Sequence, residues 1–333
     1  MLKIGLIGAG QAARAHAASY ENIKDVKVVA IADIAVERAE SLAKRFGADV
    51  LDHGDKIFDR DDIDVVDICL PTYLHHEYVL KAAEAKKHVI CETPMALDLE
   101  EAREMVEATK RANVKFMVAH DLRFSPKYLS AKRSIEEGSI GTARAVRAYR
   151  GGAHPGRESS WYSDIEKSGG AILDMAIHDI DFLSWCFGPV KEVYAKGNVY
   201  KGMEFFEYDM ITLEFEKGLI AHIAADWSKP EGTLAYESLD IAGDVGVIKF
   251  ESKDENSLGA IYDTADGGIV DPESPLDIFS VPTTKMLMEF VDAIERDTDI
   301  PVSPIESLES LNIALAAMES IRHNRPVSIK EAF

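Results

Sequence analysis

Three ionisable residues recur at helical spacing in an otherwise apolar segment, SGGAILDMAIHDIDFLSW (residues 168–185). Asp174, His178 and Asp181 stand at positions i, i+4 and i+7, which places them on one face of an α-helix. Their apolar neighbours predict a largely buried helix, where charged groups are costly unless they pair or line a cleft. A histidine held by a carboxylate exchanges protons near neutral pH. We therefore predict a general acid/base at His178, with a structural Asp–His pair as the alternative.

A glycine turn near the start of the sequence predicts a dinucleotide site. The apolar run KIGLI leads into GAGQAA (residues 8–13) and then a helical pattern, giving the motif G-x-G-x-x-A. Gly8 allows the tight turn, Gly10 lets the backbone approach a diphosphate, and the free N–H groups of the helix start favour its negative charge. The next apolar run, VKVVAIA, is followed by Asp33, whose carboxylate suits ribose hydroxyls and repels a 2′-phosphate. These features favour NAD over NADP as the cofactor. The alternative interpretation is a plain glycine turn with a solvated aspartate and no cofactor.

Alternating strand and helix patterns position this turn. Residues 1–120 contain five apolar, strand-like runs, KIGLI, VKVVAIA, IDVVDICL, HVICE and KFMVA. Helical patterns lie between them, at residues 11–22, 35–46, 75–85 and 99–112. This alternation predicts an α/β Rossmann domain, a doubly wound parallel sheet covered on both faces. Asp98, with Glu101 three residues later, indicates the capped start of the fourth helix.

The pattern changes after residue 121. A helix from Ser125-Pro126 to about residue 137 is followed by a strand, the apolar helix of residues 169–187, and many strands with hairpin-type turns. Two helices close the chain, at about residues 284–296 and 303–322. We predict an NAD-binding domain over residues 1–122. An α+β domain with a large open, mostly antiparallel sheet is expected over residues 123–333.

Composition excludes several classes of function. The 37 Lys and Arg against 58 Asp and Glu give a net charge of −21, which disfavours nucleic acids and anionic membranes. No apolar run approaches the ~18 residues of a membrane span, and the start of the sequence has no signal-peptide pattern. The three cysteines are far apart in apolar runs, and no cluster has zinc-ligand spacing. We expect a cytoplasmic protein with no metal.

Taken together, these motifs resemble the Gfo/Idh/MocA family of oxidoreductases over nearly the whole chain. The resemblance rests on GLIGAGQAA, Asp33, LPTYLHHE, KKHVICETP, the LRF and SW segments, and SGGAILDMAIHDID. The last is the most specific, and it departs from the family only at Ala171, where a third glycine is common. The family implies NAD(P)-dependent oxidation or reduction of sugars and cyclitols, and pairing through the open sheet into homodimers or homotetramers.

The resemblance also implies roles for single residues. His178 would be the base, assisted by Asp174, and Asp181 would bind sugar hydroxyls, with His154 as a further substrate contact. The residues implied for the adenosine half of NAD are Gly8, Gly10, Gln11, Ala12 and Asp33. Those implied for the path to the nicotinamide are Leu70, Pro71, His75 and Glu92, with Trp161 packing near the cofactor.

One motif position departs from the family. In CETPMA (residues 91–96), Thr93 stands where the family has the lysine of Glu-Lys-Pro. A threonine offers one neutral hydrogen bond and no charge. Losing one donor to the reacting oxygen typically costs ~10²–10³ in rate, so either another group compensates or the chemistry differs.

Three functions are therefore weighed. The first is an NAD-dependent dehydrogenase of a polyhydroxylated cyclitol, sugar or sugar derivative, with Thr93 bonding the reacting oxygen or filling space. The second is an NAD-dependent glycoside-cleaving enzyme that oxidises its substrate transiently, with no net redox change. The third is a non-enzymatic NAD-binding regulator, against which the intact Asp174–His178 pair counts.

Overall fold

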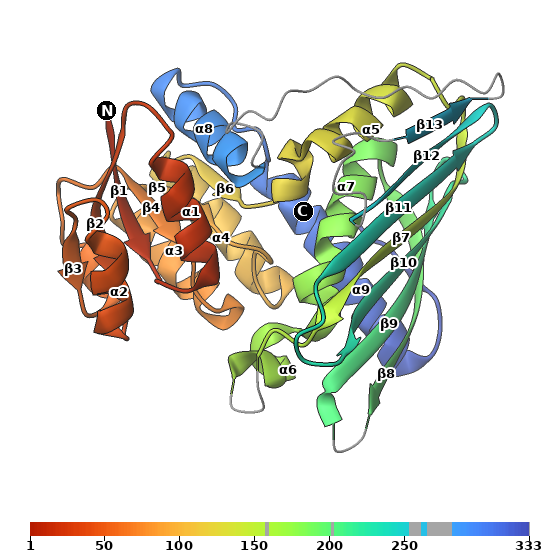
Figure 1. Cartoon of the computed structure of the whole chain (residues 1–333), viewed down its shortest axis with the longest axis horizontal. Coiled ribbons are helices and arrows are strands. Elements are labelled where there is room, and N and C mark those ends of the chain that lie inside the picture. Colours follow the sequence, from red (N-terminus) through yellow and green to blue (C-terminus); the bar gives the residue numbers. More distant parts are fainter. Residues whose placement is uncertain (157–159, 201–202, 253–260, 265–281, 333) are drawn as a thin grey trace. The chain divides into compact units, whose positions relative to one another are not determined.

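The structure, a computed structural model, describes residues 1–156, 160–200, 203–252, 261–264 and 282–332. Backbone packing divides the chain into two units (Figure 1). The first comprises Met1–Asp121 and Ile278–Leu308, and the second comprises Leu122–Asp277 and Glu309–Ala332. A single boundary at residue 122 therefore does not describe the packing, because the segment that contains helix α8 (Pro282–Glu295) belongs to the first unit.

The first unit is built on a parallel six-stranded sheet. The strands are β1 (Leu2–Ile7), β2 (Val26–Ala32), β3 (Asp49–Leu51), β4 (Val65–Ile68), β5 (His88–Cys91) and β6 (Phe116–Val118). Their order, β3-β2-β1-β4-β5-β6, is that of a doubly wound dinucleotide-binding sheet, which confirms the predicted Rossmann fold. The edge strand β3 was missed, because three residues that are mostly exposed leave no apolar run to detect.

Helices connect these strands close to the predicted bounds. They are α1 (Gln11–Tyr20), α2 (Val36–Ala43), α3 (His75–Glu84) and α4 (Leu99–Ala112). Asp98 caps α4 as expected, since its carboxylate accepts hydrogen bonds from the backbone N–H groups of Glu100 and Glu101. Helix α8 packs against α1, where the Thr284 hydroxyl donates to the Ser19 hydroxyl at 3.0 Å.

The second unit contains a sheet of eight strands among its described residues, in the order β13-β12-β11-β7-β10-β9-β8-β14. These strands are β7 (Ala143–Ala153), β8 (Val190–Tyr200), β9 (Met203–Phe215), β10 (Ile220–Lys229), β11 (Tyr236–Gly243), β12 (Gly246–Glu251), β13 (Ile261–Thr264) and β14 (Val327–Ser328). Every pairing is antiparallel except that of β7 with β10, so the sheet is mixed and mostly antiparallel, as predicted.

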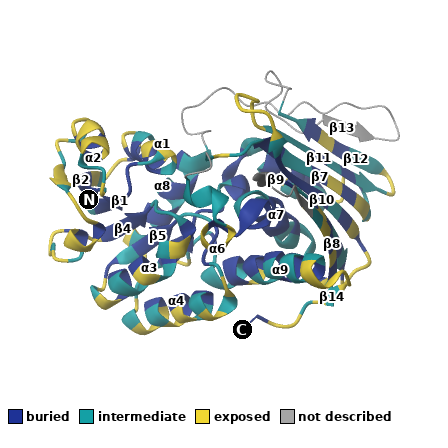
Figure 2. Ribbon diagram, turned by 90° about the horizontal axis from the view of Figure 1, so that it is seen from below, coloured by how far each residue is buried: buried dark blue, intermediate teal, exposed yellow. Residues whose placement is uncertain are grey.

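Helices cover one face of this sheet and leave the other open. The covering helices are α5 (Pro126–Glu136), α7 (Ile177–Phe187) and α9 (Pro304–His323), and the short α6 (Ile165–Ser168) precedes α7 (Figures 1 and 2). The Tyr128 ring packs edge-on against Phe182 and Phe250, with ring centres 4.8 and 4.9 Å away. The opposite face exposes apolar side chains such as Met210 and Ile220.

Two local expectations need correction. Pro126 opens α5 as predicted, but the Ser125 side chain makes no capping hydrogen bond. The helix expected over residues 169–187 is a π-helical turn (Ile172–Ala176) followed by α7. Among the described residues, no helix combines the length and apolarity needed to cross a bilayer.

Candidate functional site

The glycine turn after β1 has the shape a dinucleotide requires. Gly8 has a φ of +102°, and a Cβ there would lie 2.2 Å from the Cys69 carbonyl oxygen. The space around the Cα of Gly10 is open, since an added Cβ would meet no atom within 4 Å. Helix α1 begins at Gln11 without a side-chain cap, which suits the N–H groups of its first turn to a diphosphate. These residues fit the expected NAD.

Asp33 is held in place at the carboxyl end of β2. One carboxylate oxygen accepts a hydrogen bond of 2.7 Å from the Ala9 N–H, and the other accepts one of 2.7 Å from the Ala35 N–H. The first bond joins Asp33 to the glycine turn. A fixed carboxylate beside the diphosphate turn is the arrangement that a ribose with free hydroxyls requires.

The buried His75 side chain supports the loop that follows β4 and does not line the expected path to the nicotinamide. Its side chain is fully buried, and its two ring nitrogens lie 2.8 Å from the carbonyl oxygens of Leu70 and Pro94. Burial lowers the pKa of His75, and the two carbonyl groups act in the opposite direction. The contacts tie the loop after β4, including Pro71, to the turn after β5. His75 therefore positions these loops, which corrects its expected place against the cofactor.

The turn after β5 presents Glu92 and Thr93, both half-buried. One Glu92 carboxylate oxygen accepts a hydrogen bond of 3.2 Å from the Thr93 N–H. The other lies 3.0 Å from Nε2 of His16, on helix α1. Glu92 thus lies at the carboxyl edge of the sheet, where open α/β sheets bind their ligands.

The sequence reasoning missed His16 and its partners. His16 Nδ1 lies 2.8 Å from the Asp67 carboxylate in β4, to which the Tyr20 hydroxyl also donates at 2.9 Å. His16 is buried, which alone would lower its pKa, but the Asp67 carboxylate and other neighbours leave the pKa well above its usual value. The available signal was Asp67 itself, an acid inside the apolar run IDVVDICL.

One group of potential metal ligands lies in the same place. Donor atoms of His16, Cys69 and Glu92 lie within 4.8 Å of one another. The two His16 ring nitrogens already face separate carboxylates, Asp67 and Glu92. A metal ion would have to replace one of these ion pairs.

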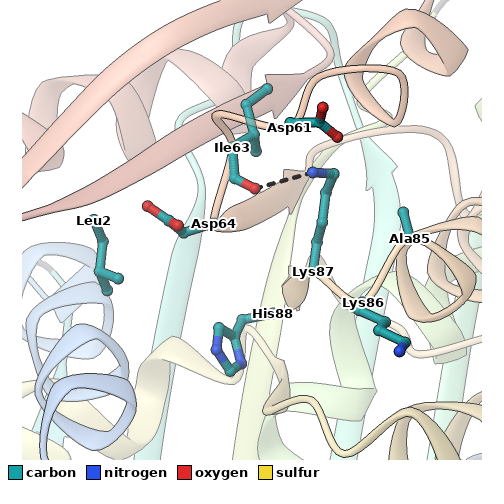
Figure 3. Close-up of a pocket in the computed structure, with 8 residues that line it drawn as sticks. All are labelled: Leu2, Asp61, Ile63, Asp64, Ala85, Lys86, Lys87 and His88. Carbon is teal, nitrogen blue, oxygen red and sulfur yellow. Dashed lines mark hydrogen bonds between the residues drawn. The ribbon is translucent and has the colours of Figure 1, made fainter.

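A shallow pocket of about 330 Å³ lies at the opposite edge of the same sheet (Figure 3). Its walls are Leu2, at the start of β1, and the segments that lead into β4 and β5. Lys87 crosses it, with Nζ donating to the Ile63 carbonyl oxygen at 3.0 Å. The pocket belongs to the amino ends of the strands, whereas ligands of such sheets bind at the carboxyl ends. We assign it no part in the chemistry.

In the second unit, the three residues predicted for one helix face separate. Asp174 and His178 are half-buried, whereas Asp181 is fully buried. Asp174 lies in the π-helical turn and His178 in the first turn of α7. Such π-turns occur frequently at functional sites because they change which side chains share a face.

Asp181 has structural partners. Its two oxygens accept hydrogen bonds of 2.8 Å from Nε and Nη2 of Arg123, and the Ser310 hydroxyl donates to one of them at 3.1 Å. The expected contact with sugar hydroxyls is therefore replaced by a buried ion pair. The spacing rule could not show this, because Arg123 lies 58 residues away in the sequence.

An acid pair lies under the start of this helix. A Glu207 oxygen accepts a hydrogen bond of 2.8 Å from the Ala171 N–H, and Asp209 follows on the same face of β9. Burial, then the charge of Glu207 and hydrogen bonding with it, raises the pKa of Asp209 to about 9. The pair therefore holds one proton at neutral pH and supports the segment that leads to Asp174.

Aromatic side chains surround the remaining two predicted residues. Trp161 stacks on Tyr162, with ring centres 3.9 Å apart. His154 packs edge-on against Trp227 of β10 at 4.8 Å, and its Nδ1 lies 2.6 Å from the Gly156 carbonyl oxygen. Rings with polar edges are suited to packing against the C–H faces and hydroxyls of a sugar.

Comparison with known proteins identifies both halves. Residues 2–120 match the model "Oxidoreductase family, NAD-binding Rossmann fold", and residues 128–249 match the "GFO/IDH/MocA C-terminal domain". The chain is 30% identical to inositol 2-dehydrogenase of Rhizobium meliloti, covering 98% of this chain and 99% of the relative. It is also 30% identical to 2,7-anhydro-N-acetylneuraminate hydratase of Escherichia coli, over 78% of this chain and 73% of the relative.

A solved structure shares the whole architecture. Levoglucosan dehydrogenase in complex with NADH and levoglucosan superposes with a TM-score of 0.88 at 27% identity, covering 99% of each chain.

Proposed function

The chain belongs to the GFO/IDH/MocA family of oxidoreductases, with an NAD-binding Rossmann domain, and on this premise we propose the reaction. It moves a hydride between nicotinamide and a secondary hydroxyl or ketone of a cyclitol, sugar or sugar derivative. The observation that carries the proposal is that half-buried Asp174 and His178 lie in the π-turn and in the first turn of α7, in a family whose relatives include inositol and levoglucosan dehydrogenases.

The residues divide the work between them. NAD, when bound, supplies the hydride acceptor. Gly10 and the first turn of α1 bind its diphosphate, and Asp33 binds the adenosine ribose. His178 takes the proton of the substrate hydroxyl as a general base. Asp174 orients the His178 ring.

Further residues complete the proposal. Leu70, Pro71 and Glu92 line the nicotinamide half, and Trp161 packs near it. Gln11 and Ala12 contribute N–H groups to the diphosphate. His154 contacts the substrate from its aromatic surroundings. Thr93, a neutral donor where the family resemblance implies a lysine, bonds the reacting oxygen without adding charge.

A second reaction is favoured by one observation. The relative from E. coli is named a hydratase, a type of reaction with no net oxidation. With Thr93 in the lysine position, the alternative for this chain is transient oxidation of a glycoside or anhydro-sugar that leaves the cofactor unchanged overall. The aromatic surroundings of His154 suit either substrate.

One incubation separates the two reactions. The purified protein is mixed with NAD⁺ and a panel of cyclitols, free sugars, sugar acids, anhydro-sugars and aryl glycosides. NADH fluorescence and product mass are recorded together. We expect NADH to form with a free polyol or sugar. Product without NADH, from a glycoside or anhydro-sugar, would replace the proposed dehydrogenase with the alternative.

We also propose that a second copy covers the open sheet face of the second unit. Tyr194, Met210 and Ile220 lie on this face with exposed fractions of 36%, 44% and 54%. Apolar groups on an open sheet are a common pairing surface. Sedimentation at micromolar concentration should give a dimer or tetramer, and Met210→Glu should shift it toward the monomer. A monomeric wild-type protein would exclude this pairing.

A further inference from the structure

A chain of polar side chains crosses the interior of the first unit. It runs from the buried Tyr20 through Asp67 and His16 to Glu92, with contacts of 2.9, 2.8 and 3.0 Å. The His16 and Asp67 side chains are 2% and 0% exposed, whereas Glu92 is 22% exposed. Only the Glu92 end reaches the surface, at the carboxyl end of β5.

Counting the protons gives the net charge of the His16, Asp67 and Glu92 side chains. Each contact between a His16 nitrogen and a carboxylate oxygen needs one shared proton, so the two contacts hold two protons. With both protons on the His16 ring, the imidazolium and the two carboxylates carry one net negative charge. The thiol of Cys69 adds no charge, because burial keeps its pKa well above the neutral range.

The position of Glu92 gives this charge a target. In a sheet of order β3-β2-β1-β4-β5-β6, the dinucleotide lies across the point where the order reverses, between β1 and β4. Asp33 follows β2, on the side of the first half. Glu92 follows β5, in the second half, where the nicotinamide belongs. A nicotinamide ring is positively charged when oxidised and neutral when reduced.

We propose that His16 is a positioning residue that clamps Glu92, fixing one negative charge that favours oxidised over reduced nicotinamide. The inference rests on the proposed NAD-dependent function and deepens it. His16 thereby fixes the charge of Glu92, next to Thr93, the position where the family has a lysine. Tighter binding of the oxidised cofactor makes bound NADH a stronger hydride donor, so substrate reduction is the favoured direction on the enzyme.

Cofactor binding tests this without turnover. Dissociation constants for NAD⁺ and NADH are measured for the wild type, Glu92→Gln and Cys69→Ser. Cys69→Ser is the matched control, because it changes a group that contacts His16 and Asp67 without altering charge. We expect Glu92→Gln to lower the ratio of the NADH dissociation constant to the NAD⁺ dissociation constant roughly tenfold, which is the effect expected of one partly screened charge. Cys69→Ser should leave this ratio unchanged.

His16→Gln adds a second readout, the pH dependence of the ratio of dissociation constants, which a purely structural role of His16 would not change. The substitution leaves the Asp67 and Glu92 carboxylates with no cation between them. The other ionisable groups in contact with Asp67 are Tyr20 and Cys69. One carboxyl group then titrates, so the binding ratio should vary with pH between 6 and 9, where the wild-type ratio stays flat. Should these variants not fold, ¹⁵N NMR of wild-type His16 should show both ring nitrogens bonded to protons.

The outcomes separate this inference from the proposed function. An unchanged ratio in Glu92→Gln, or a bare His16 nitrogen, would overturn the clamp even where NADH production upholds the dehydrogenase. A wild-type protein that bound neither NAD⁺ nor NADH would overturn both.

Discussion

The Arg123 guanidinium and the Asp181 carboxylate form two hydrogen bonds of 2.8 Å, with both side chains almost completely buried. The pair joins the segment before α5 to helix α7, which carries His178. A paired arginine–carboxylate contact of this geometry fixes orientation as well as charge. Asp181 therefore holds the helix that presents His178.

Asp181→Ala should destabilise the protein. Removing the carboxylate leaves the Arg123 charge buried without its partner, which costs about 3–5 kcal/mol. Urea unfolding measures this loss, and Glu107→Ala, which breaks an exposed ion pair with Arg111 on α4, serves as the control at less than about 1 kcal/mol. Unaltered stability together with a many-fold higher KM would return Asp181 to the role of substrate ligand.

His178→Ala should remove the acid/base. Loss of a positioned proton acceptor lowers kcat by about 10²–10⁴. The dissociation constant for NADH should stay within about twofold, because the residues proposed for the cofactor lie mainly in the first unit. The control is His222→Ala, which changes another half-buried histidine of the second unit, on β10. Full activity in the His178 variant would exclude the assigned role.

Asp33→Ala should weaken the preference for NAD⁺ over NADP⁺. The carboxylate repels a 2′-phosphate, so its loss should lower the ratio of the two kcat/KM values by about tenfold or more. The KM for NAD⁺ should also rise, because Asp33 anchors the Ala9 N–H of the glycine turn. Asp61→Ala, at the opposite edge of the sheet, should change neither value. An unaltered preference would mean that another group reads the ribose.

Asp209 predicts how stability depends on pH. Its pKa is about 9 in the folded protein and is near 3.8 in an unfolded chain, so the folded state binds more protons between these values. The free energy of unfolding should therefore fall as pH rises from about 4 to 9, by at most about 1.4 kcal/mol per pH unit. Asp209→Asn should flatten this dependence in urea titrations. A wild-type stability that rises from pH 6 to pH 9 would contradict the shared proton.

Local motifs made the glycine turn and its neighbouring carboxylate predictable. Gly8, Gly10 and Asp33 follow from one strand–helix–strand unit, where sequence spacing determines the geometry. The Rossmann fold followed from alternation of strands and helices, and the mostly antiparallel sheet from repeated hairpin turns. The short edge strand β3 carried no comparable pattern.

Long-range pairing limited the rest. His16 and Asp67 meet from α1 and β4, 51 residues apart, so neither residue marks the other in the sequence. The predicted helix face assumed a regular α-helix, whereas the π-turn at Ile172–Ala176 and the ion pair with Arg123 separate Asp181 from Asp174 and His178. A buried acid in an apolar strand signals that a partner exists without indicating which residue it is.

The most direct test of the dehydrogenase assignment follows one hydrogen atom. A substrate found in the panel is prepared with deuterium on its carbinol carbon and incubated with the protein and NAD⁺. The masses of the cofactor and the product are then measured by mass spectrometry. We expect one deuterium in NADH for each molecule of ketone formed. Deuterium that stays in a sugar product while NADH fails to accumulate would contradict it and identify a transient oxidation.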